Sequence, residues 1–319
     1  MTRPDHDPVA AVTAIVGPTA TGKTEVGLRV AERTGGEIVS ADSRQAFRGM
    51  EIGTAAPTRA ERSRVPHHGV AFLAPGERYG AGRFTRLARD WMAAIRERGR
   101  VPVLVGGTGL FVRALERPLF REPPLDPLRR RRLEEWLYGA APDRLADWAR
   151  RLDPELAGRL PRLDPQRAAR AVEVALLSGR RLSWWQAHGP QAAAPVPLRV
   201  FVLELPGDVH RDRIERRAGA ALEAGWGAEV QALRAACPDG AWLAGRPLGY
   251  RAVAEWMDGR ISRDEARRRI VRETWAYARR QRTWFRHQVP DSAVRLDARR
   301  PAAELAEAVL GAGPSGPAA

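Results

Sequence analysis

The sequence predicts an α/β fold, in which helices flank a parallel sheet and an all-helical domain is inserted into the chain. Apolar, β-prone runs at residues 12–16, 37–40 and 100–105 each precede a turn, which is typical of buried parallel strands. Strand character resumes at residues 198–205, after a long block with helical periodicity. Because strands occur on both sides of this block, we expect it to be an insertion rather than a second domain.

These changes in pattern divide the chain into four parts. The first part of the α/β core covers residues 9–120, the helical insertion covers 121–195, and the second part of the core, with basic helices, covers 196–292. Residues 293–319 contain one weak helical stretch and end in Gly-Pro-Ser-Gly-Pro-Ala-Ala. We expect this C-terminal tail to be disordered, because such a composition buries little apolar surface.

Composition narrows the function classes. The 319 residues include 53 basic and 38 acidic ones, a formal charge of +15, which favours a polyanionic partner; an arginine-rich composition without function is the alternative. The sequence has no apolar run of about 18 residues and no signal-peptide pattern, so we expect no membrane span. A single cysteine, Cys237, excludes an internal disulfide and a cysteine-based zinc site, and makes the cytoplasm the expected compartment.

Residues 17–24, Gly-Pro-Thr-Ala-Thr-Gly-Lys-Thr, match the pattern of a phosphate-binding loop between the first strand and its helix. Gly17 and Gly22 allow the turns that direct main-chain N–H groups toward an anion, Lys23 reaches the terminal phosphate, and Thr24 can ligate Mg²⁺. Lys23 is the only lysine among the 53 basic residues, which indicates a site that a guanidinium cannot serve. The parallel sheet core is therefore predicted to be P-loop NTPase-like.

Two further strand ends carry polar residues. Asp42 follows the strand at 37–40, and Thr108 follows the strand at 100–105 in a Gly-Gly-Thr-Gly turn. In open α/β sheets the carboxyl ends of the strands face the ligand, so we expect both side chains beside the phosphate-binding loop. For Asp42 we favour a catalytic or Mg²⁺-linked role over that of a helix N-cap.

The C-terminal third is rich in arginine. Residues 246–286 contain twelve arginines and five acidic residues, with aromatic residues between them, as a surface that holds RNA phosphates and stacks bases would need. Arginines 129–132 fit either a solvated helix face or a nucleic-acid contact. The tryptophans of the insertion fit packing better than base stacking, and Arg217 fits either a surface ion pair or a diphosphate contact.

Seven segments together resemble the tRNA dimethylallyltransferases, also called tRNA isopentenyltransferases. They occur in the family's order between residues 12 and 286. They are Gly-Pro-Thr-Ala-Thr-Gly-Lys-Thr at 17–24, Ser-Ala-Asp-Ser-Arg-Gln at 40–45 with Gly-Met-Glu-Ile-Gly-Thr at 49–54, Pro-His-His at 66–68, Val-Gly-Gly-Thr-Gly-Leu at 105–110, Asp-Pro-Gln-Arg-Ala-Ala-Arg-Ala-Val-Glu at 164–173, Gly-Tyr-Arg at 249–251, and Arg-Arg-Gln-Arg-Thr-Trp-Phe-Arg at 279–286. One cysteine is too few for the zinc-finger extension of eukaryotic members, so the resemblance is to the bacterial form.

The resemblance implies transfer of a dimethylallyl group from dimethylallyl diphosphate to N6 of the adenosine just 3′ of the anticodon in tRNA, with Mg²⁺ as cofactor. The implied partner is the anticodon stem-loop, and we expect a monomer. The implied diphosphate-binding residues are Gly17, Pro18, Thr19, Ala20, Thr21, Gly22, Lys23 and Thr24, with Mg²⁺ on Thr24, and the implied catalytic residues are Asp42, Lys23, Thr108 and Arg217. The implied tRNA-facing positions are Asp42, Ser43, Arg44, Gln45, Thr108, Arg130, Gln166, Arg167, Ala168, Ala169, Arg170, Arg246, Gly249, Tyr250, Arg251, Arg279, Arg280, Gln281, Arg282, Trp284 and Arg286.

Three other interpretations stay open at this level. An isopentenyltransferase acting on free AMP or ATP would not need the helical insertion, a P-loop kinase would turn over ATP, and a non-catalytic RNA-binding protein would not need Lys23 and Asp42 together. The chain departs from the family pattern at Phe47, where a tyrosine is common, which removes a hydroxyl near the expected pocket. For His67 and His68 we favour structural packing over chemistry.

Overall fold

The structure, a computed structural model, divides into two compact units. The larger unit consists of Met1–Glu116 and Val196–Ala319, and the smaller one is Arg117–Pro195. The residues described are 10–121, 125–159, 164–243 and 247–312. Among the helices in these ranges, none is long and apolar enough to cross a membrane.

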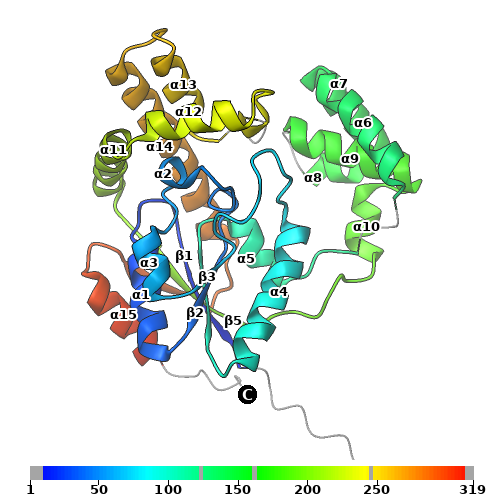
Figure 1. The fold of residues 1–319 in the computed structure, drawn as a ribbon. Helices are drawn as coiled ribbons and strands as arrows, with labels where there is room; N and C mark the ends of the chain where they lie inside the picture. The colour runs from blue at the N-terminus through cyan, green and yellow to red at the C-terminus, as the bar shows by residue number, and fades with distance from the viewer. Residues whose placement is uncertain (1–9, 122–124, 160–163, 244–246, 313–319) are drawn as a thin grey trace, which may run out of the picture. The chain divides into compact units, whose positions relative to one another are not determined.

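The larger unit contains a six-stranded sheet in which all neighbouring strands are parallel (Figure 1). The strand order is β3-β2-β4-β1-β5-β6. The strands are β1 (Val12–Val16), β2 (Glu37–Ser40), β3 (His67–His68), β4 (Pro102–Gly106), β5 (Leu198–Glu204) and β6 (Val294–Asp297). Since β1, β4 and β2 are neighbours, the loops that follow them lie at the same edge of the sheet.

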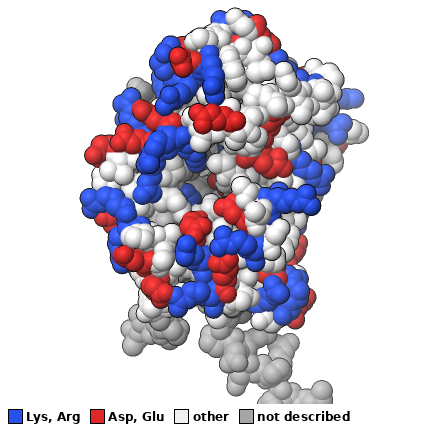
Figure 2. All heavy atoms as spheres, turned by 60° about the vertical axis from the view of Figure 1, so that its left-hand side comes forward, with Lys and Arg blue, Asp and Glu red and all other residues white. Residues whose placement is uncertain are grey.

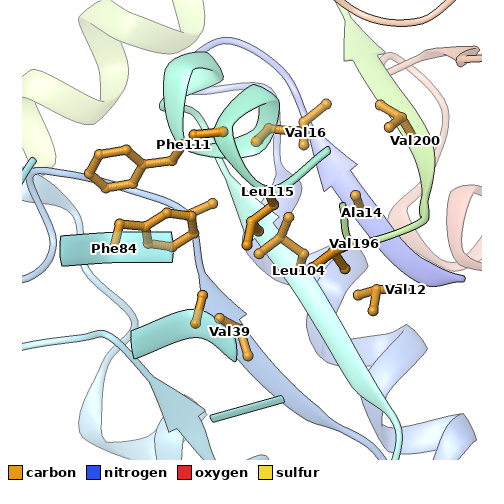
Figure 3. Packing of buried hydrophobic residues seen from close by; sticks show 14 of the residues in the cluster. Val12, Ala14, Val16, Val39, Phe84, Leu104, Phe111, Leu115, Val196 and Val200 are labelled. Atoms are coloured by element: carbon orange, nitrogen blue, oxygen red, sulfur yellow. The ribbon is translucent and has the colours of Figure 1, made fainter. Parts of the chain in front are cut away.

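Alternate residues of the strands pack on opposite faces of the sheet. On one face, α4 (Ala81–Glu97) and α5 (Gly109–Glu116) cover Val39 and Leu104 with the rings of Phe84 and Phe111, which stack at 4.3 Å (Figure 3). On the other face, α1 (Lys23–Thr34) and α15 (Ala302–Gly311) cover Ile15 and its neighbours. Burial on both faces explains why the central strands read as continuous apolar runs.

A third layer of helices has its own core, around Trp226 and Tyr250. It is formed mainly by helices from the second half of the chain, with one short helix from the first half. The elements are α2 (Glu51–Thr54), α11 (Gly207–Glu223), α12 (Trp226–Ala236), η1 (Ala241–Leu243), α13 (Tyr250–Met257) and α14 (Arg263–His287). The short helix α3 (Arg59–Arg64) lies against α1 instead. The 25-residue helix α14 begins at an N-cap, Ser262, whose hydroxyl accepts a hydrogen bond from the Glu265 main-chain N–H.

The two histidines of β3 have structural partners. His68 donates through Nε2 to the buried carboxylate of Glu37 at 2.7 Å, and Arg98 donates to the same Glu37 oxygen at 2.7 Å. His67 bonds to the Val65 carbonyl through Nδ1 at 2.7 Å. The bond between His68 and Glu37 attaches the two-residue edge strand β3 to β2, a structural role for His68.

The expectation of a disordered tail at 293–319 is wrong for residues 294–311. Strand β6 pairs with β5 over Phe201 to Glu204, and its Leu296 is buried. In α15, Leu305 and Val309 are buried in the core that α1 also covers. Few apolar residues are sufficient here, because their spacing places them all on the face that meets the sheet. Residues 313–319 lie outside the described part of the chain.

The smaller unit is all-helical, as expected for an insertion at 121–195. Its helices are α6 (Pro127–Gly139), α7 (Pro142–Leu152), α8 (Pro154–Arg159), α9 (Pro165–Ser178) and α10 (Leu182–His188). The buried carboxylate of Asp153 accepts hydrogen bonds from the N–H groups of Leu156 and Ser183, and so connects α8 to α10. Trp136 and Trp148 stack on each other at 4.9 Å but stay 51% and 40% exposed, so packing buries these two only in part.

Candidate active site

The predicted phosphate-binding loop connects β1 to α1, and two glycines shape it. Gly17 has φ of +144°, and a Cβ there would lie 2.5 Å from the Leu203 carbonyl oxygen of β5. Gly22, with φ of +89°, precedes the first turn of α1. Both positions therefore require glycine, and the loop turns sharply into the N-terminus of a helix, where main-chain N–H groups and the helix dipole favour an anion.

Lys23 is the first residue of α1, and its side chain reaches back to the loop. Its ammonium group donates to the Pro18 carbonyl at 2.5 Å, and the buried Thr21 hydroxyl donates to the same oxygen at 2.9 Å. Burial lowers the pKa of Lys23 to about 8; the Asp42 carboxylate partly offsets this, and the positive charge of Arg217 adds to it. Lys23, Asp42 and Arg217 are thus close enough to act on one another, although they come from three separate segments.

Arg217 approaches the loop from α11. Burial lowers the pKa of its guanidinium and the charge of Asp42 raises it. In the described ranges, no carboxylate forms an ion pair with Arg217. The alternative of a surface ion pair is therefore not what the structure shows, and Arg217 lies within the electrostatic reach of both Lys23 and Asp42.

Asp42 and Thr108 come together at the ends of β2 and β4. Thr108 donates its main-chain N–H to the Ala41 carbonyl at 3.0 Å, and its hydroxyl accepts the Ser43 N–H at 2.9 Å. One Asp42 oxygen accepts the Arg44 N–H at 2.8 Å. A Cβ on Gly106 would lie 2.2 Å from the Ala41 oxygen, so only glycine permits this approach.

Two tyrosines that the sequence did not single out for chemistry lie within the field of Asp42. Burial, and then the charge of Asp42, raise the pKa of Tyr277 to about 12, and the charge of Arg44 and the side chain of Thr108 partly oppose this. Burial also raises the pKa of Tyr79, where Arg83 opposes the effect and Asp42 adds to it. The Tyr79 hydroxyl is buried without a hydrogen-bond partner in the described part of the chain. Neither position carries a local motif that could have revealed it.

Two family profiles match this chain. The sequence profile described as IPP transferase matches residues 45–288, and the one described as isopentenyl transferase matches residues 10–66. The chain belongs to the IPP transferase family. The tRNA dimethylallyltransferase of Halorhodospira halophila is 46% identical over 88% of this chain and 91% of that protein. That of Syntrophobacter fumaroxidans is 41% identical over 86% of this chain and 80% of that protein.

A solved structure agrees with this membership. The tRNA isopentenylpyrophosphate transferase of Bacillus halodurans superposes with a TM-score of 0.65 at 31% identity, over 95% of this chain and 96% of that one. The parallel sheet with flanking helices and the predicted α/β fold class are therefore those of the IPP transferase family.

Several residues predicted to face RNA in this IPP transferase are structural instead. Tyr250 is fully buried, and its hydroxyl contacts Glu229 Oε1 at 2.7 Å and the Met50 carbonyl at 2.9 Å. Gly249 has φ of +80°, and a Cβ there would lie 2.5 Å from the Trp226 ring. Both residues lie at the N-terminus of α13 and are buried there, so the prediction of RNA contact is wrong for both.

Two glutamines predicted to face RNA also use their side chains inside the fold. Gln45 accepts from the Ser40 hydroxyl at 3.3 Å and donates to the Ala55 carbonyl at 3.0 Å. Gln281 is only 6% exposed, and both ends of its amide are bonded to the main chain. A glutamine between basic or polar residues cannot be assigned to surface or interior from its type alone.

Other predicted RNA-facing residues of the larger unit are accessible. Arg251, Arg279, Arg280 and Arg286 are exposed, whereas Ser43, Arg44, Arg282 and Trp284 are half-buried. Arg280 lies over the Tyr277 ring at 5.8 Å. Figure 2 shows basic side chains at many places on one face of the molecule, with acidic ones between them. Arg246 lies outside the described residues.

In the smaller unit, two predicted RNA contacts surround a buried carboxylate. Arg130 pairs with Glu173 at 2.7 Å and Arg170 pairs with its other oxygen at 3.0 Å. Arg167 pairs with Asp164 at 3.2 Å on the exposed side, where Gln166 also lies, and Ala169 is half-buried. Ala168 is fully buried in the helical core, so its prediction as an RNA-facing residue is wrong.

Proposed function

We propose that this chain is a tRNA dimethylallyltransferase that acts on the adenosine 3′-adjacent to the anticodon. It would transfer the dimethylallyl group of dimethylallyl diphosphate to N6 and release diphosphate. The observation that carries the proposal is the two-sided site: two cations, Lys23 and Arg217, lie in the loop region, within the field of one carboxylate, Asp42. A phosphoryl-transfer enzyme and this alkyl-transfer enzyme can share the loop, but the carboxylate beside it suits an amine acceptor.

On the donor side, the loop at Gly17 to Thr24 would hold the diphosphate. As the allylic C–O bond breaks, negative charge grows on the leaving diphosphate, and Lys23, Arg217 and loop N–H groups stabilise it. Lys23 must give up its bond to the Pro18 carbonyl, or share it, to contact phosphate. The nearby anion would itself favour the protonated form of Lys23, whose pKa is about 8 without it.

On the acceptor side, Asp42 would accept a hydrogen bond from the adenine amine and then its proton. An exocyclic amine gains positive charge as it attacks the allylic carbon, so a carboxylate beside it stabilises the transition state. Thr108 would orient the base, because its hydroxyl already connects the Asp42 turn to the β4 end. A base in an RNA loop has to leave the stack to reach this position.

Mg²⁺ is proposed as the cofactor. Within the described residues no group of three or more His, Cys, Asp or Glu side chains could hold a metal. The proposed protein ligand is a single one, the Thr24 hydroxyl. This fits Mg²⁺, which in phosphate sites takes one or two protein ligands and completes its shell with phosphate oxygens and water. The ion would neutralise charge on the diphosphate.

The exposed arginines of α13 and α14 would hold the phosphates of the anticodon stem-loop. Arg251, Arg279, Arg280 and Arg286 are candidates, with the half-buried Trp284 beside them in sequence. We expect the proposed activity to take place in the cytoplasm, and a monomer remains the expected state.

Nucleoside analysis tests the proposal. The purified protein is incubated with dimethylallyl diphosphate, Mg²⁺ and either an unmodified anticodon stem-loop with consecutive adenosines, AMP or ATP; the products are digested and weighed. A C₅H₈ increment on one loop adenosine and on neither nucleotide is the expected result. Product on AMP or ATP alone would assign the chain to free-nucleotide transfer, and ADP release without prenylation would assign it to the kinases.

A further inference from the structure

Gln281 joins the two halves of the proposed site. From α14, its Oε1 accepts the main-chain N–H of Thr19 in the phosphate-binding loop at 2.9 Å. Its Nε2 donates to the carbonyl of Gly107 at 2.7 Å, one residue before Thr108. A Cβ on Gly107 would lie 2.7 Å from this Nε2, so the turn has no room for a larger residue. One buried amide therefore bonds to the loops that follow β1 and β4.

The bond to Thr19 also sets the position of Lys23. The Pro18–Thr19 peptide is planar and trans, so its N–H and C=O point in opposite directions. The N–H is directed at Gln281 and the C=O at the Lys23 ammonium group. A continuous chain of hydrogen bonds thus runs from Lys23 through this peptide and Gln281 to Gly107.

His210 holds the same loop residue from α11. Its Nε2 lies 2.7 Å from the Thr19 carbonyl oxygen, so the ring donates there. His210 is fully buried, with its ring edge against Trp275 at 5.6 Å. Both main-chain polar groups of Thr19 are therefore bonded to buried side chains from the second half of the chain. The next residue, Ala20, has φ of +62°, a conformation that non-glycine residues adopt only when the surroundings impose it.

We propose that Gln281, with His210, is a positioning residue of the transfer reaction: it sets the separation between the diphosphate loop and the acceptor turn and keeps Lys23 aimed into the loop. This inference rests on the proposed function. Bimolecular displacement requires the attacking nitrogen about 3–3.5 Å from the allylic carbon, and a misplacement of about 1 Å can cost about 10²-fold in rate. The diphosphate and the adenine would be held by different strands, so a direct connection between them controls this distance.

The first test compares two substitutions of glutamine in or next to α14. Gln281→Met keeps the volume and removes both hydrogen bonds, and Gln288→Met is the matched control, whose side chain accepts from Arg113 at the surface. For Gln281→Met we expect kcat to fall about 10- to 100-fold, with the KM for dimethylallyl diphosphate and the affinity for the stem-loop close to wild type. The control should keep wild-type kcat. A kcat equal to that of the control would overturn the proposal.

Hydrogen exchange of the Thr19 amide gives a readout that does not depend on activity. In the wild type this N–H should exchange slowly, and in Gln281→Met it should exchange many times faster while the core strands stay protected. Unchanged protection of the Thr19 amide would overturn the inference. This test also holds if the wild type transfers no C₅ group, in which case the proposed function fails separately. If Gln281→Met does not fold, two variants of His210 replace it. His210→Gln keeps a hydrogen-bond donor, and His210→Phe removes it. The proposal is supported if His210→Gln keeps the kcat and loop protection of the wild type and His210→Phe loses both. Equal values in the two variants would overturn it.

Discussion

Replacing Tyr250 by phenylalanine separates a core role from an RNA contact. The phenol contacts Glu229 Oε1 at 2.7 Å, and the same carboxylate accepts the N–H groups of Ile52 and Gly53 at 2.7 and 3.0 Å. Glu229 thus caps α2, the short helix that follows the Asp42 segment. The ring of Tyr250 keeps its edge contact with Trp226 at 5.3 Å in the variant, so only one oxygen is lost.

The magnitude follows from the partners that remain. A hydrogen bond to a charged acceptor contributes about 1.5–3 kcal/mol to stability. Because Glu229 retains two N–H donors, its carboxylate is not left without partners, and we expect a loss of about 2 kcal/mol in the free energy of unfolding. For a unit of this size each kcal/mol lowers the Tm by about 2–4 °C, so the Tm should fall by about 4–8 °C.

Urea and thermal unfolding measure this loss, and stem-loop binding is measured well below the Tm. Glu229→Gln and the double variant complete a cycle, in which we expect a coupling energy of about 1–2 kcal/mol between the phenol and the carboxylate. RNA affinity of the folded Tyr250→Phe protein should equal that of the wild type. Unchanged stability together with an affinity loss of about tenfold would refute the core role and restore Tyr250 as an RNA contact.

Three more outcomes are expected. Asp42→Asn should slow single-turnover transfer by about 10²- to 10⁴-fold with RNA affinity unchanged, and a near-wild-type rate would contradict the general-base role. Burial opposes ionisation of Glu37, but hydrogen bonds from Arg98 and His68 outweigh this effect and hold the pKa of Glu37 below its ordinary value. The stabilisation by the Glu37 carboxylate is therefore present above the pKa of the unfolded state, and it is lost as the pH falls through the pKa of the folded state. Glu37→Gln should therefore cost about 2 kcal/mol at pH 7, and the gap to wild type should narrow below about pH 4; a gap constant with pH would refute this. Arg279→Ala with Arg280→Ala should reduce the slope of log K against log salt by about 1–2, and an unchanged slope would show a solvated face.

Local sequence was sufficient wherever a short segment determines its own geometry. The loop at Gly17 to Thr24 depends on glycines whose φ values and close contacts allow no other residue, and its position between a strand and a helix is readable from apolar patterning. The side-by-side position of Asp42 and Thr108 followed from the rule that the ends of parallel strands share an edge. Family membership followed from segments spread over most of the chain.

Residue type did not distinguish outward from inward positions within the basic helices. Arg279 and Arg280 are exposed while Gln281, the next residue, is buried, because only one side of α14 packs against the loops of the sheet. The composition of the tail was a poor guide for the same reason. Leu296, Leu305 and Val309 are few, but their spacing places each of them against the core.

The sequence by itself determined the phosphate-binding loop, the parallel sheet and the family, because each depends on local spacing and on strand-end geometry. Tertiary structure alone decided which side chains connect the loops to one another. Gln281 bonds to Thr19 across 262 positions of the chain and His210 does so across 191, and Tyr250 reaches Met50 across 200. Contacts between residues so far apart arise only when helices pack against the sheet, and no local pattern in one sequence specifies them.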